Sequence, residues 1–213
     1  MPLKVYGMAQ SACTRRVLIT LAEKNITDYE LVIVNLPLRE QYQPSYTEKA
    51  PFGKVPLLDD NGFLIYESRA ICQYIARKYC DQGTKLMPKE VDLQAYGLFE
   101  QACSVEMNFF DVPVYALVWE KRAQLGEPDE VMAKKNLDLL DTTLAVYETI
   151  LSKQKFLAGD EITLADLYHL PYGAEAWEVG LRDVIRKYPH VTRWFESLQS
   201  RDSWKRVLLD SSL

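Results

Sequence analysis

The pattern of apolar and polar positions in the N-terminal part of the chain changes between a strand-like and a helical period. Short β-rich runs at residues 3–7 and 29–34 predict strands. Residues 12–24 and 68–79 carry apolar side chains at helical spacing, which predicts helices. A short, irregular helix is expected at residues 40–49.

Two further apolar runs, at residues 57–65, surround the pair Asn61-Gly62. An Asn-Gly turn between apolar runs is the strongest short-range signal of a β-hairpin. Pro56 opens this hairpin and cannot donate a ladder hydrogen bond, so the strand end is expected to stay free of regular pairing. If the Val55–Pro56 bond is cis, the exposed backbone of Val55 can pair with an extended peptide ligand. With a right-handed crossover, the order β-α-β-α-β-β-α gives two parallel strands and an antiparallel hairpin beside them, which is the thioredoxin-like arrangement.

The chain is expected to divide into two domains. Residues 81–87 are polar, include Gly83 and precede Pro88, so they predict a linker. Beyond the linker, apolar residues step by three and four, as on one face of a helix. We therefore expect a thioredoxin-like domain at residues 1–80 and an all-helical domain at residues 88–213.

Two apolar stripes in the second half are expected to face the interior of the helical domain. The first lies on a long helix in which Pro113 predicts a kink or a break. Its members are Val91, Ala95, Leu98, Ala102, Val105, Phe109, Val112 and Ala116. The second stripe lies on the next helix and consists of Ala133, Leu137, Leu140, Leu144, Tyr147 and Leu151.

A later helix start carries two reinforcing devices. Thr163 and Asp166 have the spacing of a capping box, and Ile162 and Leu167 are placed as a hydrophobic staple around it. Loss of Asp166 is expected to cost on the order of 1 kcal/mol or more, because a buried helix start would lose its cap. This device concerns folding and not catalysis.

The composition of the 213 residues argues against several classes of protein. Apolar residues make up 48% and charged residues 26%, which is ordinary for a globular protein. A net charge of −5 argues against nucleic-acid binding, which needs clustered Lys and Arg. No apolar run approaches the ~18 residues that span a bilayer, and the N-terminus has no basic start before an apolar signal core. Neither a membrane protein nor a secreted protein is expected.

Cysteine and histidine usage predicts a reduced, cytoplasmic compartment and no metal site. The four cysteines are scattered along the chain and form no CxxC pair, so a disulfide framework is not expected. The two histidines, His169 and His190, lack metal-ligand spacing.

Ser11 lies where the first expected strand meets the first expected helix. One interpretation is an N-cap, in which the hydroxyl satisfies an orphan amide of the helix. The other uses the same geometry, because a helix N-terminus favours an anion and a hydroxyl there can donate a hydrogen bond to a bound thiolate. Lowering a thiol pKa of about 8.5 by ~2 units requires ~2.7 kcal/mol of preferential thiolate stabilisation, which a helix terminus and one donor can supply. Position alone leaves both interpretations open.

Three motifs, in order along the chain, favour the second role of Ser11, binding of a thiolate. They are Tyr6-Gly7 followed by Ser11-Ala12-Cys13-Thr14-Arg15-Arg16-Val17, then Ala50-Pro51-Phe52-Gly53-Lys54-Val55-Pro56, and then Glu67-Ser68-Arg69-Ala70-Ile71-Cys72-Gln73-Tyr74-Ile75. Together they resemble the phi class of glutathione transferases, strongly over residues 1–80 and more weakly in the helical half. The resemblance implies an enzyme that binds glutathione as co-substrate and activates its thiol through Ser11. The thiolate would be conjugated to hydrophobic electrophiles or would reduce organic hydroperoxides.

The resemblance also implies a glutathione site. Glu67 and Ser68 match the residues that hold the γ-glutamyl end, where a carboxylate binds the ammonium group and a hydroxyl with helix-start amides binds the carboxylate. Simple capping of the third helix is the alternative role of this pair. Tyr42 departs from the family pattern, in which a Lys is usual, and the lost cation is expected to weaken binding of the glycyl carboxylate by ~1 kcal/mol. The other expected members are Val55, whose backbone pairs with the cysteinyl part, the adjoining Pro56, and Lys54 and Gln41 towards the glycyl end.

The hydrophobic substrate is expected beside the thiolate, between the first loop and the first long helix. Its candidate wall consists of Met8, Ala9, Phe109, Phe110, Tyr115, Tyr168 and Tyr172, each of which could equally belong to the core.

Two residues compete with Ser11 for the catalytic role. Other transferase classes use a tyrosine near Tyr6, although packing is the role expected for this strand residue. Cys13 lies in the first turn of the helix, where a thiol pKa can be depressed, and would form a mixed disulfide with glutathione. The cysteine-type classes, however, have their cysteine at the position of Ser11.

Two other functions stay open from the sequence. A non-catalytic carrier of apolar or aromatic small molecules would use the same cleft as an enzyme. An interaction module of the translation-factor type has neither an appended domain nor a basic extension to support it. A homodimer is expected from the family, with the third-helix side of one N-terminal domain meeting the long helices of the partner. Phe52 is a candidate aromatic plug in that dimer, or else part of its own subunit's core.

Overall fold

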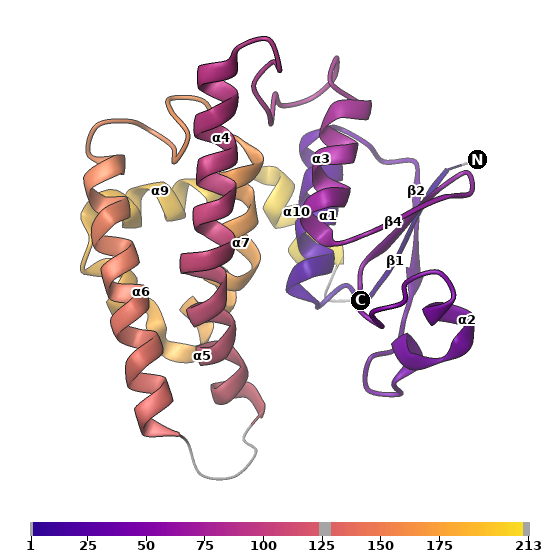
Figure 1. Cartoon of the computed structure of the whole chain (residues 1–213), viewed down its shortest axis with the longest axis horizontal. Helices are drawn as coiled ribbons and strands as arrows, with labels where there is room; N and C mark the ends of the chain where they lie inside the picture. The colour runs from indigo at the N-terminus through magenta and orange to yellow at the C-terminus, as the bar shows by residue number, and fades with distance from the viewer. Residues whose placement is uncertain (1, 124–128, 211–213) are drawn as a thin grey trace. The chain divides into compact units, whose positions relative to one another are not determined.

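The computed structural model describes residues 2–123 and 129–210 of the chain. It divides into two compact units (Figure 1). The first comprises Met1–Lys85 and Asp202–Leu213, and the second comprises Leu86–Arg201. The C-terminal segment, which was expected in the helical domain, therefore groups with the first unit.

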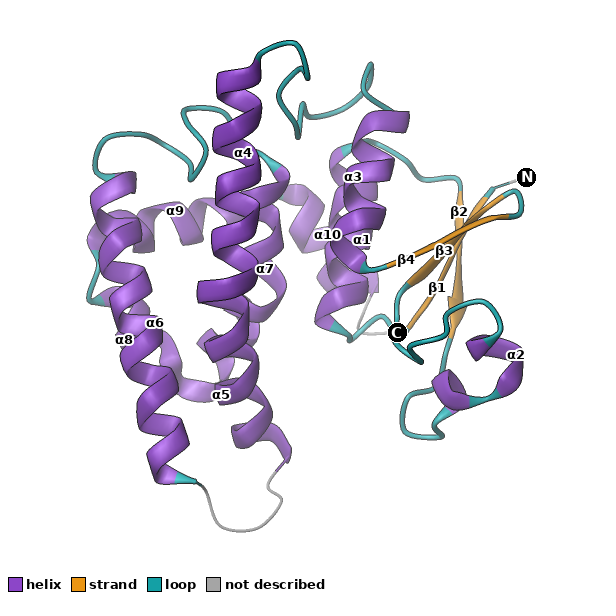
Figure 2. Cartoon of the chain, in the orientation of Figure 1, coloured by secondary structure: helices purple, strands orange, loops and turns teal. Residues whose placement is uncertain are grey.

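The first unit contains a four-stranded mixed sheet, as Figure 2 shows. β1 and β2 are parallel, with Val5 opposite Leu31, and β3 is antiparallel to both β1 and β4. The predicted thioredoxin-like arrangement is confirmed. The strands are β1 (Leu3–Gly7), β2 (Tyr29–Ile33), β3 (Leu57–Asp60) and β4 (Phe63–Tyr66), in the order β2-β1-β3-β4.

The turn between β3 and β4 has the backbone that its sequence predicts. Asn61 has a φ of 55° and Gly62 a φ of 93°, so both central residues are left-handed. A two-residue hairpin turn of type I′ requires this conformation. The Asp59 carboxylate accepts a hydrogen bond from the Gly62 amide at 2.7 Å and holds the turn closed.

Helices α1 (Ala12–Glu23) and α3 (Ser68–Lys78) pack against each other, and α10 (Asp202–Asp210) packs against α1. Trp204 and Val207 of α10 are buried, which explains why this segment belongs to the first unit. The irregular helix expected at residues 40–49 is observed as two short pieces, η1 (Glu40–Tyr42) and α2 (Pro44–Thr47).

The second unit is built from helices. Figure 1 shows α4 continuing into α5, with α6 beside them. Two π-helical segments, η2 and η3, interrupt the regular helices. The elements are α4 (Leu93–Val105), η2 (Glu106–Phe110), α5 (Asp111–Ala123), α6 (Glu130–Leu151), α7 (Leu164–Ala176), η3 (Trp177–Leu181), α8 (Arg182–Arg186) and α9 (Pro189–Gln199).

The first predicted apolar stripe is wrong at four of its eight positions, whereas Ala102 is buried and the other three are half-buried. Leu98, Phe109 and Val112 are 52%, 51% and 54% exposed, and Val91 is 87% exposed. The core face runs one position later along the chain, because successive helical residues point about 100° apart and apolar residues stand on both sides of the boundary. The buried residues are Phe99, Ala102, Cys103, Glu106, Phe110, Pro113, Val114, Leu117 and Val118.

Pro113 lies inside α5 without ending it. Because proline has no amide hydrogen, the Phe109 carbonyl one turn earlier loses its helical donor. The Thr143 hydroxyl of α6 donates to that carbonyl at 3.1 Å instead. The expected break is thus replaced by the π-helical segment η2 and a side-chain hydrogen bond from the neighbouring helix. On α6 itself the second stripe holds, since Leu140, Leu144, Tyr147 and Leu151 are all buried.

The start of α7 has the capping box that the sequence predicts. The Asp166 carboxylate accepts the Thr163 amide at 2.9 Å, and it also accepts the Leu157 amide and the Trp194 indole N–H, each at 3.0 Å. Ile162 and Leu167, the predicted staple, are both buried. Asp166 therefore ties together a loop, a helix start and α9, which is more than a cap does.

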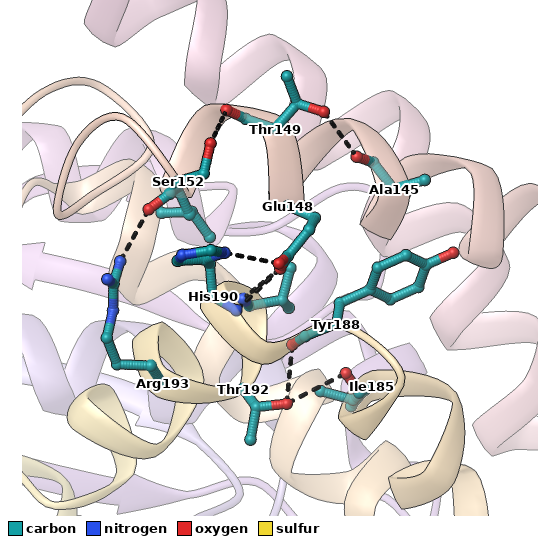
Figure 3. Close-up of polar contacts among 11 residues, drawn as sticks. Ala145, Glu148, Thr149, Ser152, Ile185, Tyr188, His190, Thr192 and Arg193 are labelled. Carbon is teal, nitrogen blue, oxygen red and sulfur yellow. Dashed lines mark hydrogen bonds and ion pairs between the residues drawn. The ribbon is translucent and has the colours of Figure 1, made fainter.

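A second carboxylate caps α9 from outside the helix (Figure 3). Glu148 of α6 accepts the His190 amide at 2.8 Å, the Val191 amide at 3.1 Å and the His190 Nδ1 at 2.6 Å. Partial burial acts to raise the pKa of the Glu148 carboxyl, but these hydrogen bonds together outweigh it and place the pKa below its ordinary value. The ionised carboxylate therefore stabilises the fold.

Replacing Glu148 by glutamine is expected to lower the free energy of unfolding at neutral pH by about 1–2 kcal/mol, since a charge-assisted cap is lost. A carboxyl with a lowered folded-state pKa contributes stability above its unfolded pKa and loses it as pH falls through the folded one. The difference between wild type and E148Q should therefore shrink below about pH 4, near the ordinary pKa of Glu. Urea unfolding at several pH values measures this. Glu196→Gln, an exposed residue of α9, is the control, and equal losses in both variants would contradict the assignment.

Candidate active site

Ser11 lies in the turn between β1 and α1. The Ser11 amide donates to the Met8 carbonyl at 2.9 Å, and the Arg15 amide donates to the Ser11 carbonyl at 2.9 Å, which is the first hydrogen bond of the helix. Ser11 is the N-cap residue, with an extended backbone (φ −68°, ψ 127°), and it is half-buried.

The Ser11 hydroxyl does not cap the helix, although its residue occupies the cap position. Within the described residues it makes no side-chain hydrogen bond to the amides of the first turn. The first amides of a helix have no carbonyl partners of their own, so α1 presents donors and a partial positive charge here. The capping interpretation of Ser11 therefore lacks the hydrogen bond on which it depends.

Gly7, at the end of β1, allows α1 to approach the strand closely. A Cβ at this position would lie 2.6 Å from the Thr14 Oγ1 and 2.8 Å from the Thr14 Cγ2. Thr14 is fully buried, and in the described part of the chain its hydroxyl has no hydrogen-bond partner. The close contact between the strand end and the first helical turn fixes the path of the residues between them.

The two rivals of Ser11 have other surroundings. The Tyr6 side chain packs against a buried cluster that includes Val34, Tyr46 and Leu57, and the Lys49 ammonium lies 5.0 Å from its ring centroid. Packing is thus the observed environment of Tyr6. The Cys13 thiol is half-buried, and the Arg16 Nη1 lies 3.5 Å from its Sγ.

The loop before β3 contains a cis peptide bond between Val55 and Pro56. The Tyr46 hydroxyl donates to the Lys54 carbonyl at 2.7 Å and anchors the loop from α2. Burial raises the pKa of Tyr46 to about 12, so this donor keeps its proton throughout the neutral range. Among the described residues, the Val55 backbone makes no hydrogen bond with another backbone group, as expected for a segment that pairs with a ligand.

The expected glycyl-end residues lie on η1 and the same loop. The Gln41 Oε1 is buried without a hydrogen-bond partner in the described structure, whereas Lys54 is exposed. Tyr42 is 49% exposed, and the Arg39 guanidinium lies 5.3 Å from its ring centroid. Arg39 therefore supplies a cation beside the position where the family pattern has a lysine. Arg39 was not predicted from the sequence, because stacking on a neighbouring ring leaves no signal in residue spacing.

Glu67 and Ser68 begin α3. Glu67 has a φ of 71°, a left-handed conformation that is rare for a residue with a side chain and is found at functional sites. The Glu67 side chain makes no cap hydrogen bond to the helix. Ser68 is buried. The Glu67 side chain therefore lacks the hydrogen bond that the capping alternative requires.

The expected substrate wall is split between exposed and buried positions. Phe110 and Tyr168 belong to the core of the helical unit, at 3% and 1% exposed, and the Phe110 ring lies 4.5 Å from that of His169. Phe109 and Tyr115 are exposed, and the Tyr115 ring contacts that of Tyr172 at 5.7 Å. Tyr115 also stacks on Trp119, with ring centroids 6.3 Å apart, and Trp119 was not among the predicted wall residues. In the first unit, Met8 is half-buried and Ala9 is buried.

Metal-binding side-chain groups and membrane-spanning helices are both absent from the described residues. Within residues 2–123 and 129–210, no group of three or more His, Cys, Asp or Glu side chains is placed to hold a metal ion. None of the described helices combines the length and the apolar character needed to cross a bilayer.

Comparison with known proteins gives matches over nearly the whole chain. The family described as "Glutathione S-transferase, N-terminal domain" matches residues 1–77, and "Glutathione S-transferase, C-terminal domain" matches residues 91–202. The chain is 47% identical over 215 aligned positions to glutathione S-transferase hmp2 of Hypomyces subiculosus, covering 99% of this chain and 100% of the relative.

Solved structures agree with these matches. Glutathione transferase F7 from Populus trichocarpa superposes with a TM-score of 0.93 at 36% identity, covering 99% of this chain and 100% of the poplar chain. Glutathione S-transferase I from maize, in complex with an atrazine glutathione conjugate, superposes with a TM-score of 0.89 at 32% identity, covering 100% and 99% of the two chains.

Proposed function

Because the chain belongs to the glutathione S-transferase family, and within it to the phi class, we propose that it activates the glutathione thiol through the Ser11 hydroxyl. Membership makes the protein a glutathione transferase that acts on electrophiles. The proposal concerns the residue that generates the thiolate, the way glutathione is held, and the chemistry that follows.

The observation that carries the proposal is the unused Ser11 hydroxyl. It stands at the N-terminus of a helix of 12 residues and makes no cap hydrogen bond there. A hydroxyl donor and a helix terminus both favour a negative charge, so both favour the thiolate over the thiol. Lowering a thiol pKa from about 8.5 to about 6.5 corresponds to ~2.7 kcal/mol, which these two features can supply.

Two reactions are open to the thiolate. In conjugation, the sulfur attacks an electrophilic carbon, a carbon–sulfur bond forms, and the leaving group departs with its electron pair. In peroxide reduction, the sulfur attacks an oxygen of the O–O bond, giving an alcohol and a glutathione sulfenic acid. A second glutathione then converts the sulfenic acid to the disulfide and water. The maize relative was solved with an atrazine conjugate, which favours conjugation as the main reaction.

Glutathione would be held by complementary charges along an extended peptide. Glu67 would bind the ammonium group of the γ-glutamyl end, while Ser68 and the first amides of α3 bind its carboxylate. The Val55 backbone, next to Pro56, would pair with the cysteinyl part. Towards the glycyl carboxylate the donors would be Gln41, Lys54 and, in place of the usual lysine, Arg39.

Burial reduces the set of candidate residues for the hydrophobic substrate wall. In the first unit we retain Met8 and withdraw Ala9, which is 7% exposed. In the helical unit we retain Phe109, Tyr115 and Tyr172. Phe110 and Tyr168 are withdrawn, because both are buried in the helical core. Exposed aromatic rings suit planar electrophiles, which stack on them.

We also propose a cytoplasmic homodimer. Phe52 is 69% exposed and its ring meets that of Tyr66 at 5.8 Å, edge to face, so it does not fill the core of its own subunit. Phe63 and Leu64 of the edge strand β4 are also exposed, at 52% and 39%. A second copy of the chain would cover these apolar side chains.

The competing function is a non-catalytic carrier of apolar molecules. Steady-state turnover with glutathione and an aryl halide, and with glutathione and cumene hydroperoxide, distinguishes the two functions when binding of a fluorescent apolar dye is measured alongside. We expect glutathione-dependent turnover of the aryl halide, faster than that of the hydroperoxide. Binding of both glutathione and dye without turnover of either substrate would instead support the carrier.

A further inference from the structure

Arg15 makes hydrogen bonds to the turn that carries Ser11. Residues 8–11 form a turn closed by the hydrogen bond from the Ser11 amide to the Met8 carbonyl, at 2.9 Å. Arg15 contacts this turn twice. Its amide donates to the Ser11 carbonyl at 2.9 Å, and its side-chain Nε donates to the Ala9 carbonyl at 3.2 Å.

The direction of the Arg15 side chain follows from the helix. Side chains of an α-helix point back towards its N-terminus, so a long side chain in the first full turn reaches the residues before the helix. Ala9 is 7% exposed, so solvent does little to hold its peptide group. The hydrogen bond from Nε orients the peptide plane between Ala9 and Gln10, which directly precedes the peptide bond between Gln10 and Ser11.

We propose that Arg15 is a positioning residue, whose Nε–H holds the turn in the conformation that presents the Ser11 hydroxyl to the glutathione thiolate. The inference rests on the proposed role of Ser11. Arg15 acts here through the geometry of the turn and not through its charge. The two roles can be tested separately, because one replacement of Arg15 keeps a hydrogen-bond donor without the charge and another removes both.

Glutamine and methionine are the informative replacements. In glutamine the amide nitrogen is bonded to Cδ, as Nε is in arginine, so Arg15→Gln keeps a donor at the same place and removes the charge. Methionine has similar length but no donor, so Arg15→Met removes both. A role through the hydrogen bond predicts that the two variants differ, whereas a role through charge predicts that they agree.

R15M is expected to lower kcat about 10-fold or more, since displacement of a catalytic group by a fraction of an ångström has effects of this size. The KM for glutathione should change less than about twofold, because the residues proposed to bind the tripeptide are untouched. The pH at which kcat/KM is half-maximal should rise towards that of the free thiol. R15Q should retain kcat within about twofold.

Two controls complete the experiment. In a Ser11→Ala background, R15M should cause less than about a twofold further loss, because a residue that acts through Ser11 cannot act once the hydroxyl is gone. Arg193→Met is the matched control, because the Arg193 Nη2 donates to the Leu151 carbonyl at 2.8 Å, within the helical unit. R193M should leave kcat and the pH profile unchanged.

Each alternative outcome has a definite meaning. Unchanged kcat and pH profile in R15M, an equal loss in R15Q, or an undiminished loss in the S11A background each overturn the positioning role. If R15M does not fold, R15Q decides, since a 10-fold loss with the donor still present contradicts the proposal and retained kcat supports it. Full activity of S11A alone would refute the proposed function itself, and inactive S11A with active R15M would refute only the role of Arg15.

Discussion

Replacing Ser11 by alanine is expected to lower kcat for conjugation by roughly 100-fold, the usual effect of removing one preorganised donor from a developing or bound anion. The Ser11 hydroxyl makes no cap hydrogen bond in the folded protein, so its removal should leave stability nearly unchanged. Glutathione should still bind, because the residues proposed to hold its two ends are elsewhere. The assay is steady-state turnover of an aryl halide, with glutathione affinity measured by calorimetry.

The pH dependence of the same variant tests the physical reason. If the hydroxyl stabilises the thiolate, S11A needs a higher pH to ionise bound glutathione, and its kcat/KM profile should move towards the free thiol pKa of about 8.5. Cys13→Ser and Tyr6→Phe are the controls for the two rivals, and both should keep the wild-type profile. An S11A protein with wild-type turnover, together with a loss in either control, would transfer the role to that residue.

The fold of the first unit was predictable because its signals are local. The Asn61-Gly62 pair determines a turn of two left-handed residues, and the periods of the flanking runs differ enough to separate strands from helices. The unit to which α10 belongs was not predictable from such local signals. Its partner is α1, almost the whole chain away, and nothing in a local apolar pattern tells which unit will bury Trp204.

In the first stripe of the helical unit, the predicted buried face and the observed one differ by a single position along the chain. Leu98 and Phe99 are adjacent and both apolar, yet the first is 52% exposed and the second is fully buried. A periodic pattern cannot choose between such neighbours when apolar residues occupy both. The π-helical segment η2 further changes the phase of the helix, and the Thr143 hydroxyl of another helix donates to the Phe109 carbonyl within it.

In the candidate site, too, features with a local sequence signal were predictable, and features that depend on tertiary contacts were not. Position alone gave Ser11 two roles, and the family motifs favoured catalysis before any geometry was known. The left-handed backbone of Glu67 and the contact of Arg15 with the Ala9 carbonyl are tertiary facts that no spacing reveals. The substrate wall was the least predictable part, since Phe109 and Phe110 are neighbours of the same type and only the first is exposed.

The largest effect on stability is expected at Asp166. The sequence alone suggested a loss on the order of 1 kcal/mol or more, the value of one helix cap. In the structure its carboxylate is fully buried and accepts the amides of Leu157 and Thr163 and the indole N–H of Trp194. Asp166→Ala would leave these donors buried without an acceptor, at about 1–3 kcal/mol each before relaxation. We therefore expect the free energy of unfolding to fall by at least about 3 kcal/mol.

Asp92 provides the matched comparison, because it caps α4 in the ordinary way. Its carboxylate accepts one hydrogen bond, from the Ala95 amide at 3.1 Å, at an exposed helix start. Asp92→Ala should cost about 0.5–1 kcal/mol, the value of a single solvent-exposed cap. Urea unfolding followed by far-UV circular dichroism measures both variants under the same conditions. Similar losses would mean that Asp166 is only a cap, whereas a loss several times larger at Asp166 would show that one carboxylate joins the start of α7 to the loop before it and to α9.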